Sequence, residues 1–334
     1  MITRRTALAM LAAAPAVRCF AQPADLPRPP APTPPRLDGA VPQSSQSLLK
    51  SGVEWGEQLY EGTKPAFRAR APEQVQNVRL HDVATRAAPE WLVECDSKAS
   101  ITDAVIERID AQCTRGCIRV RGDSARVQIR DIQAQGSVIR EQKRLPGGIV
   151  IAGNASDVTI ERAVMRGFQT DWGDSRYWNG DGFASERGNR RIVIRDCAAI
   201  DNSDGGFDMK AKNSRFEGVN LAQGNARNFR FWESWDAATL VSLEPVLRGG
   251  RGGRAHIGIY GGGEQSAPRT IRIGKLVARA SGSNRAALFH MEAGGPFTVV
   301  IDSHDIALPQ GTALVDGEAA DALELVWRSG PPQL

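Results

Sequence analysis

Short segments in which apolar residues alternate with polar ones recur along this chain from about residue 76. Residues 127–131, 158–162 and 192–196 are clear examples, and each predicts a strand with one buried face. The central apolar residues of successive segments are 22 to 34 residues apart. They are Ile129, Ile160, Ile194, Phe216, Leu243, Ile273 and Ile301. A repeat of this size indicates a solenoid, a propeller or another stacked array.

The composition of the repeat narrows this choice. Two or three short strands fit into each repeat, and no pattern for a helix of ten or more residues lies between them. Leucine-rich repeats would show regularly spaced leucines, and propeller blades need about 40 residues or more. We therefore expect an all-β fold, a right-handed parallel β-helix (β-solenoid) over residues 76–328. The hydrophobic fraction of 41% is enough for a continuous core.

The first 21 residues have the pattern of an export signal. Arg4 and Arg5 precede an apolar stretch over residues 7–17, and residues 19–21 offer a small-residue cleavage site. The paired arginines resemble a twin-arginine signal, but an ordinary secretory signal explains them equally well. Both interpretations predict a periplasmic or secreted protein. The apolar stretch is too short to span a bilayer, and no other segment is a transmembrane candidate.

Two further segments precede the repeats. Residues 22–45 are rich in proline, which predicts a stiff, solvated linker outside the fold. Residues 46–75 show no clear pattern, and we expect an N-terminal cap or an irregular first turn. Cleavage after residue 21 removes three arginines and no acidic residue, so the net charge falls from +4 to +1. The basic excess is therefore no argument for nucleic-acid binding.

Phenylalanines at 24-residue intervals suggest how the coils stack. Phe183, Phe207 and Phe231 have this spacing, and we expect their rings to stack inside the same face. Asn and Gly residues tolerate left-handed backbone angles, so we expect them at the turns. The candidates are Asn154, Asn179, Gly180, Asn202, Asn213 and Asn225.

Two acidic motifs lie one predicted coil apart. Residues 179–183 read NGDGF, and residues 201–210 read DNSDGGFDMK. The pair resembles β-helix polysaccharide lyases of the pectate lyase type, especially the family nine lyases, over roughly residues 147–260. That family carries a D-G-F element followed by a D-N-x-D-D-G-F-D element. The resemblance implies Ca²⁺ bound by aspartates, and a lysine that abstracts a proton from an acidic polysaccharide.

Residue by residue, the resemblance implies calcium ligation by Asp181, Asp204 and Asp208. The family's fourth aspartate falls on Gly205, and no lysine stands at the position of the family's base. Independently, two stacked coils would bring Asp181 and Asp204 close enough to share a Ca²⁺, which prefers several oxygen ligands. Three carboxylates held together without a cation should carry raised pKa values.

Strand alternation gives the other candidates. With Phe207 and the phenylalanines of the next coil inside, Asp208, Lys210, Arg230 and Trp232 should point outward. Lys210 and Arg230 are the candidate catalytic groups, because an uronate lyase needs a base near its C5 proton. The expected substrate-binding residues are Trp232, His256, Tyr260 and Lys212.

Three functions remain open from the sequence. The first is a Ca²⁺-assisted lyase that cleaves an acidic polysaccharide by β-elimination. The second is a non-catalytic β-helix that binds glycans or has a structural role, since Asp-Gly pairs are also ordinary turn formers. The third is a glycoside hydrolase, for which Asp204 with Asp208 or Asp181 would supply the two carboxylates.

Overall fold

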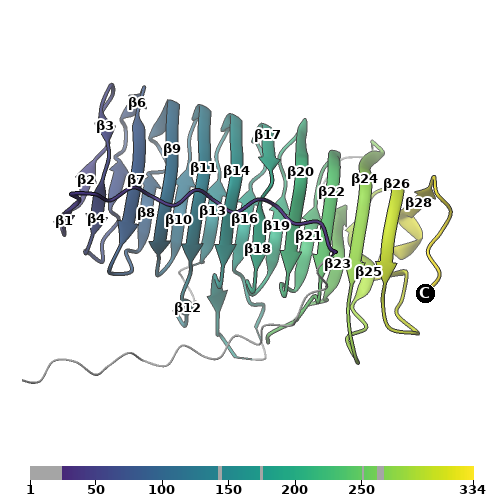
Figure 1. Ribbon diagram of the computed structural model, residues 1–334. Helices are drawn as coiled ribbons and strands as arrows, with labels where there is room; N and C mark the ends of the chain where they lie inside the picture. Colours follow the sequence, from purple (N-terminus) through teal and green to yellow (C-terminus); the bar gives the residue numbers. More distant parts are fainter. Residues whose placement is uncertain (1–24, 142–144, 174–175, 250–251, 262–266) are drawn as a thin grey trace, which may run out of the picture.

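A stack of parallel strands forms nearly the whole molecule in the computed structural model, which describes residues 25–141, 145–173, 176–249, 252–261 and 267–334. Among these residues all strand pairs are parallel and belong to two long sheets and one short one. Figure 1 shows the strands side by side along one axis, from β1 to β28. The expected right-handed parallel β-helix is confirmed. In the described ranges, no helix is long and apolar enough to cross a membrane.

The strands of each sheet follow the order of the coils. Sheet A contains β1 (Val41–Gln43), β4 (Gln58–Tyr60), β7 (Arg79–Thr85), β9 (Ser100–Gln112), β11 (Ala125–Gln135), β14 (Ser156–Arg166), β17 (Arg190–Arg195), β20 (Ser214–Gln223), β22 (Trp235–Leu243), β24 (Arg269–Arg279), β26 (Phe297–Ala307) and β28 (Leu323–Trp327), with β3 (Glu54–Trp55), β6 (Gln74–Gln76) and β18 (Ala198–Ile200) beside them. Sheet B contains β2 (Ser47–Leu48), β5 (Phe67–Ala69), β8 (Trp91–Cys95), β10 (Gly116–Val120), β13 (Gly147–Ile151), β16 (Asp181–Ser185), β19 (Gly205–Met209), β21 (Arg227–Phe231), β23 (Ala255–Gly261), β25 (Ala287–Gly294) and β27 (Val315–Asp316). β12 (Val138–Ile139) pairs with β15 (Gln169–Thr170), and a single 3₁₀ turn, η1 (Ala320–Ala322), lies before β28.

Stacked side chains fill the space between the sheets. Phe183, Phe207 and Phe229 occupy equivalent positions of β16, β19 and β21, with parallel rings whose centroids are 4.7 and 5.1 Å apart. The expectation that Phe231 follows Phe207 in this stack is wrong, because Phe231 pairs with Met209. Phe207 and its register partner Phe229 are 22 residues apart. Phe231, which is 24 residues after Phe207, therefore falls in the neighbouring column of side chains, beside Met209. Both Phe229 and Phe231 are buried, as expected.

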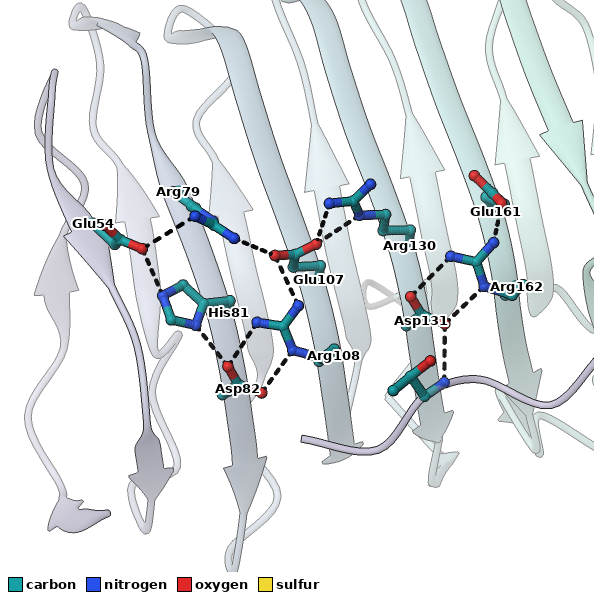
Figure 2. A network of polar contacts seen from close by, with 11 residues as sticks. Glu54, Arg79, His81, Asp82, Glu107, Arg108, Arg130, Asp131, Glu161 and Arg162 are labelled. Atoms are coloured by element: carbon teal, nitrogen blue, oxygen red, sulfur yellow. Dashed lines mark hydrogen bonds and ion pairs between the residues drawn. The ribbon is translucent and has the colours of Figure 1, made fainter. Parts of the chain in front are cut away.

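Strands β7, β9, β11 and β14 of sheet A each bend near the middle at a residue with a left-handed backbone, and a fifth such residue lies between β17 and β18. We call these residues the bend ladder: Asp82, Arg108, Asp131, Arg162 and Asp196, with φ between 48° and 56°. Their charges alternate from coil to coil. Arg108 donates two hydrogen bonds to Asp82, and Arg162 donates two to Asp131 (Figure 2). These charge-assisted bonds offset the cost of a left-handed conformation in residues with a Cβ.

A second column of alternating charge lies beside the bend ladder. Paired positions of neighbouring strands carry Glu107, Arg130, Glu161, Arg195 and Glu217. Glu107 is fully buried and receives hydrogen bonds from Arg79 and Arg130 (Figure 2). Because a cation always faces an anion in the next coil, a shift of one coil would place like charges together. The two columns therefore favour the observed register.

Residues 41–76 belong to the coil stack. Strands β1 to β6 pair in both sheets, so the helix begins well before the expected boundary. The described part of the proline-rich segment, from residue 25, lies lengthwise along the coils and is not a free linker (Figure 1). The predicted signal peptide, residues 1–21, lies outside the described residues.

Candidate functional site

The outer face of sheet B carries the candidate residues. In β21 and β23 the alternation is interrupted by a local bend, at which two successive side chains both point inward: Asn228 and Phe229 in β21, and His256 and Ile257 in β23. On one side of the bend, Gly205 pairs with Arg227. On the other side, Asp208 pairs with Arg230. Since β16, β19 and β21 are neighbours, their outward side chains are brought together from three coils.

These side chains form a dense group of ion pairs. We call it the charged cluster: Asp181, Asp204, Asp208, Lys210, Arg227, Arg230 and Glu292. Arg227 approaches Asp204 at 3.0 Å and also pairs with Glu292. Arg230 donates a hydrogen bond of 2.7 Å to Glu292. All three aspartates and both arginines are less than 9% exposed, so the cluster is buried although it lies on the outside of the coil.

Tyr177 closes one side of the charged cluster. It comes from the loop before β16, and its hydroxyl donates a 2.5 Å hydrogen bond to Asp204. Arg227 and Arg230 each donate a longer bond to the same hydroxyl oxygen. Burial and the Asp204 carboxylate raise the pKa of Tyr177 well above its ordinary value. The hydroxyl therefore keeps its proton and acts as a donor.

Two carboxyl groups of the cluster, Asp181 and Asp204, have raised pKa values. Burial raises the pKa of Asp181 well above its ordinary value, and the carboxylates of Asp204 and Asp208 add to this shift. A single donor in the protein is found for Asp181 among the described residues, the backbone N–H of Gly205 at 2.8 Å. The pKa of Asp204 is also raised by burial, although Arg227 and Arg230 oppose the shift. Asp181 is thus the group best placed to hold a proton at neutral pH.

Lys210 is fixed between two carboxylates. Its ammonium group lies 2.9 Å from Asp208 and 3.0 Å from Glu186. Burial favours the neutral amine, but the two carboxylates outweigh it and raise the pKa of Lys210. The same balance, with Asp208 and Asp204 as the main carboxylates, raises the pKa of Arg230. Neither group is a free base in this arrangement, which weakens the catalytic role expected for them.

Aromatic side chains lie at the more exposed edge of the cluster. The rings of Trp232 and Tyr260 are 3.8 Å apart at their centroids, and both residues are half-buried. The indole N–H of Trp232 donates a 2.6 Å hydrogen bond to Asp208. The guanidinium of Arg230 lies 4.7 Å from the Trp232 ring centre. The expected grouping of Asp208, Lys210, Arg230, Trp232 and Tyr260 on one outer face is observed.

Two other expected substrate-binding residues lie elsewhere. His256 is fully buried inside the coil, where its Nδ1 is 2.8 Å from the hydroxyl of Ser242. The expectation that it faces outward is wrong, because the bend of β23 turns both His256 and Ile257 inward. Burial lowers the pKa of His256 to about 3. Lys212 is exposed at the turn after β19, and its backbone pairs with Arg190.

The three aspartates do not fit the expected calcium site. Each of them is already engaged by protein donors: the Gly205 N–H for Asp181, Arg227 and Tyr177 for Asp204, and Trp232 and Lys210 for Asp208. A Ca²⁺ ion would have to displace these donors from the carboxylate oxygens before it could bind there. Within the described ranges, no group of three or more His, Cys, Asp or Glu side chains is placed to hold a metal ion.

Sequence reasoning missed three members of the site: Tyr177, Glu186 and Arg227. Arg227 was detectable in principle, since it follows Gly205 in the register of sheet B. Glu292 follows two coils later and reaches back to both arginines. Tyr177 lies in a loop whose path the strand pattern does not define.

Comparison of the chain with protein-family models, with curated proteins and with solved structures finds no match. The class that the fold defines is therefore the parallel β-solenoid, with stacked, all-parallel sheets.

Proposed function

We propose that this protein is an exported, carbohydrate-active β-helix enzyme that cleaves an acidic polysaccharide at the charged cluster, without calcium. The observation that carries the proposal is the set of three buried aspartates beside two arginines and a lysine. Burying so many charges is costly, and groups with strongly shifted pKa values occur preferentially at functional sites.

The charged groups supply the two requirements of such a site. Glu186 is 45% exposed on its side chain and holds the ammonium of Lys210. The carboxylate of a bound uronate has the same chemistry and would replace Glu186 there. The half-buried ring pair of Trp232 and Tyr260 offers an apolar surface beside it for a sugar ring.

The carboxyl groups favour acid catalysis over abstraction of a proton by Lys210. A carboxyl group with a raised pKa donates a proton to a departing glycosidic oxygen, and a second carboxylate stabilises the positive charge that develops. Water then adds its oxygen to the anomeric carbon and returns a proton to the first carboxylate. Asp181 fits the first role, because burial and two neighbouring carboxylates raise its pKa. Asp208 fits the second. Family nine lyase chemistry would instead require a neutral base and calcium, and the cluster favours neither.

A panel of acidic polysaccharides tests the proposal. We expect new reducing ends without absorbance from unsaturated uronates, with equal rates in the presence of a chelator. Asp181→Asn should lower the rate roughly 10²–10⁴-fold, whereas Lys212→Ala, at the exposed turn outside the cluster, should not. If unsaturated uronate products form, and their formation stops when a chelator is added, the Ca²⁺-assisted lyase would replace this proposal.

A second function, glycan binding without cleavage, is favoured by one observation: most charged groups of the cluster already pair with each other. Saturable binding of an acidic polysaccharide with no new chain ends would support it. In that case Trp232→Ala should weaken binding, and Asp181→Asn should leave binding unchanged.

A further inference from the structure

The proline-rich segment contacts sheet A at regular intervals. Leu26 is buried among apolar residues that include Leu221, Val241 and Val277, from β20, β22 and β24. Farther along, the backbone N–H of Thr33 donates a 2.9 Å hydrogen bond to Asp131 of β11. The segment then reaches β7, so it runs against the order of the coils before it enters β1 (Figure 1).

The two polar contacts have the same geometry. The backbone N–H of Thr33 binds Oδ1 of Asp131, and that of Arg36 binds Oδ1 of Asp82 at 2.8 Å. In both aspartates, Oδ1 also accepts a hydrogen bond from the Nε of the arginine in the next coil of the bend ladder. The two arginines, Arg108 and Arg162, are seen on their aspartates in Figure 2. The bend ladder thus presents an equivalent acceptor every second coil.

The spacing of the donors matches this ladder. Three residues in polyproline II conformation advance about 9.3 Å. Two steps between neighbouring strands cover about 9.6 Å. Thr33 and Arg36 are three residues apart, and β7 and β11 are two strands apart. Residues 32, 34 and 35 are prolines, which have no N–H. Non-proline residues stand where the aspartates need a donor.

We propose that the bend of sheet A is a docking track for a chain in polyproline II conformation, and that residues 25–37 are its intramolecular occupant. We call this segment the latch. It fixes the N-terminal region along the coils between β22 and β7, through one apolar anchor and two backbone hydrogen bonds to buried carboxylates. Because the acceptors lie on different coils, the latch docks only when those coils are stacked in register.

Hydrogen exchange of the full chain tests the latch with a matched pair of variants. Arg36→Pro removes the donated N–H and keeps a backbone suited to polyproline II, whereas Arg36→Ala keeps the N–H. We expect slow exchange at Thr33 and at position 36 in the wild type and in Arg36→Ala. In Arg36→Pro the amide of Thr33 should exchange about tenfold faster, which corresponds to losing one hydrogen bond to a charged group.

A synthetic peptide of residues 23–38 gives a second measurement. It should bind the double variant Thr33→Pro, Arg36→Pro, whose own latch is weakened, and should bind the wild type at least tenfold less tightly. Circular dichroism of the double variant should keep the β signal of the wild type. The proposal would be overturned if Thr33 and Arg36 exchanged as fast in the wild-type protein as in the free peptide. Equal exchange in Arg36→Pro and Arg36→Ala would also overturn it.

Discussion

Tyr177 donates its hydroxyl hydrogen to Asp204 over 2.5 Å, while Arg227 approaches the other oxygen of the same carboxylate at 3.0 Å. The carboxylate is thereby held between a loop side chain and a side chain of β21. Burial alone would make this carboxylate costly, and its two partners repay part of that cost. The loop before β16 is therefore attached to the charged cluster through the Tyr177 hydroxyl, which donates to Asp204 and accepts longer bonds from Arg227 and Arg230.

Tyr177→Phe should destabilise the protein by roughly 1.5–3 kcal/mol, the range for a hydrogen bond to a charged group. Tyr60→Phe is a matched control, because Tyr60 donates to a neutral backbone oxygen, that of Lys64. Its expected loss is about 0.5–1.5 kcal/mol. Urea unfolding of both variants measures the difference. Equal losses would mean that the bond to Asp204 contributes no more than a neutral one.

Asp181→Asn should change the pH dependence of stability. The pKa of Asp181 is higher in the folded than in the unfolded state, so the folded protein binds the proton more tightly. The contribution of Asp181 to the free energy of unfolding is fully present below the unfolded-state pKa of about 3.9. It is lost as the pH rises through the pKa of Asp181 in the folded state. Asparagine resembles the protonated acid, so the variant should lack this loss. A wild type and variant with parallel stability curves above pH 4 would contradict the assignment.

Asp82→Asn should show the opposite pH dependence. Hydrogen bonds from Arg108, together with those from Arg36 and His81, lower the pKa of Asp82 although burial opposes them. Its contribution is therefore present above a pH of about 4 and disappears as the pH falls through the folded pKa. We expect the variant to be less stable by about 2–3 kcal/mol at pH 7, with the difference shrinking in acid. Denaturant unfolding at several pH values measures this, and a constant difference would count against it.

The sequence was sufficient to predict the parallel β-helix but not the positions at which its strands bend. Alternation of apolar and polar residues has a period of two only where the strand is straight. At the bend of β23 the alternation is interrupted, and His256 turns inward against the expectation. The left-handed positions were equally hidden. They were expected at Asn and Gly residues, and among the named candidates Asn213 and Gly180 do have a positive φ. In sheet A, however, they are occupied largely by Asp and Arg, which hydrogen-bond across the coils.

Asn202 and Asn225 lie in the turns before β19 and β21, as expected, but neither has a left-handed backbone. Asn202 and Asn225 are fully buried, and Asn225 Oδ1 accepts bonds from both the backbone and the side-chain nitrogen of Asn202. They satisfy buried polar groups inside the stack. A single sequence gives residue types at these positions, whereas their roles depend on which coil lies above and below. For the charged cluster, the strand pattern identified Asp208, Lys210 and Arg230 as outward, but Arg227, the partner of Asp204, lies in the next coil and required the register.

Gly205→Asp tests whether the missing fourth aspartate would create a calcium site. A Cβ at position 205 would lie 2.8 Å from Oδ1 of Asp181 and 3.3 Å from Cβ of Asp208, so a side chain there forces its neighbours to move. We expect a loss of about 1–3 kcal/mol in stability, typical of overpacking, with Gly205→Ala as the control for volume without charge. Calorimetry should detect no calcium binding at millimolar concentration in the wild type or in either variant, because Arg227 and Lys210 already neutralise the neighbouring carboxylates. Calcium binding by Gly205→Asp with restored stability would show that the cluster accepts the ion once the fourth ligand is present.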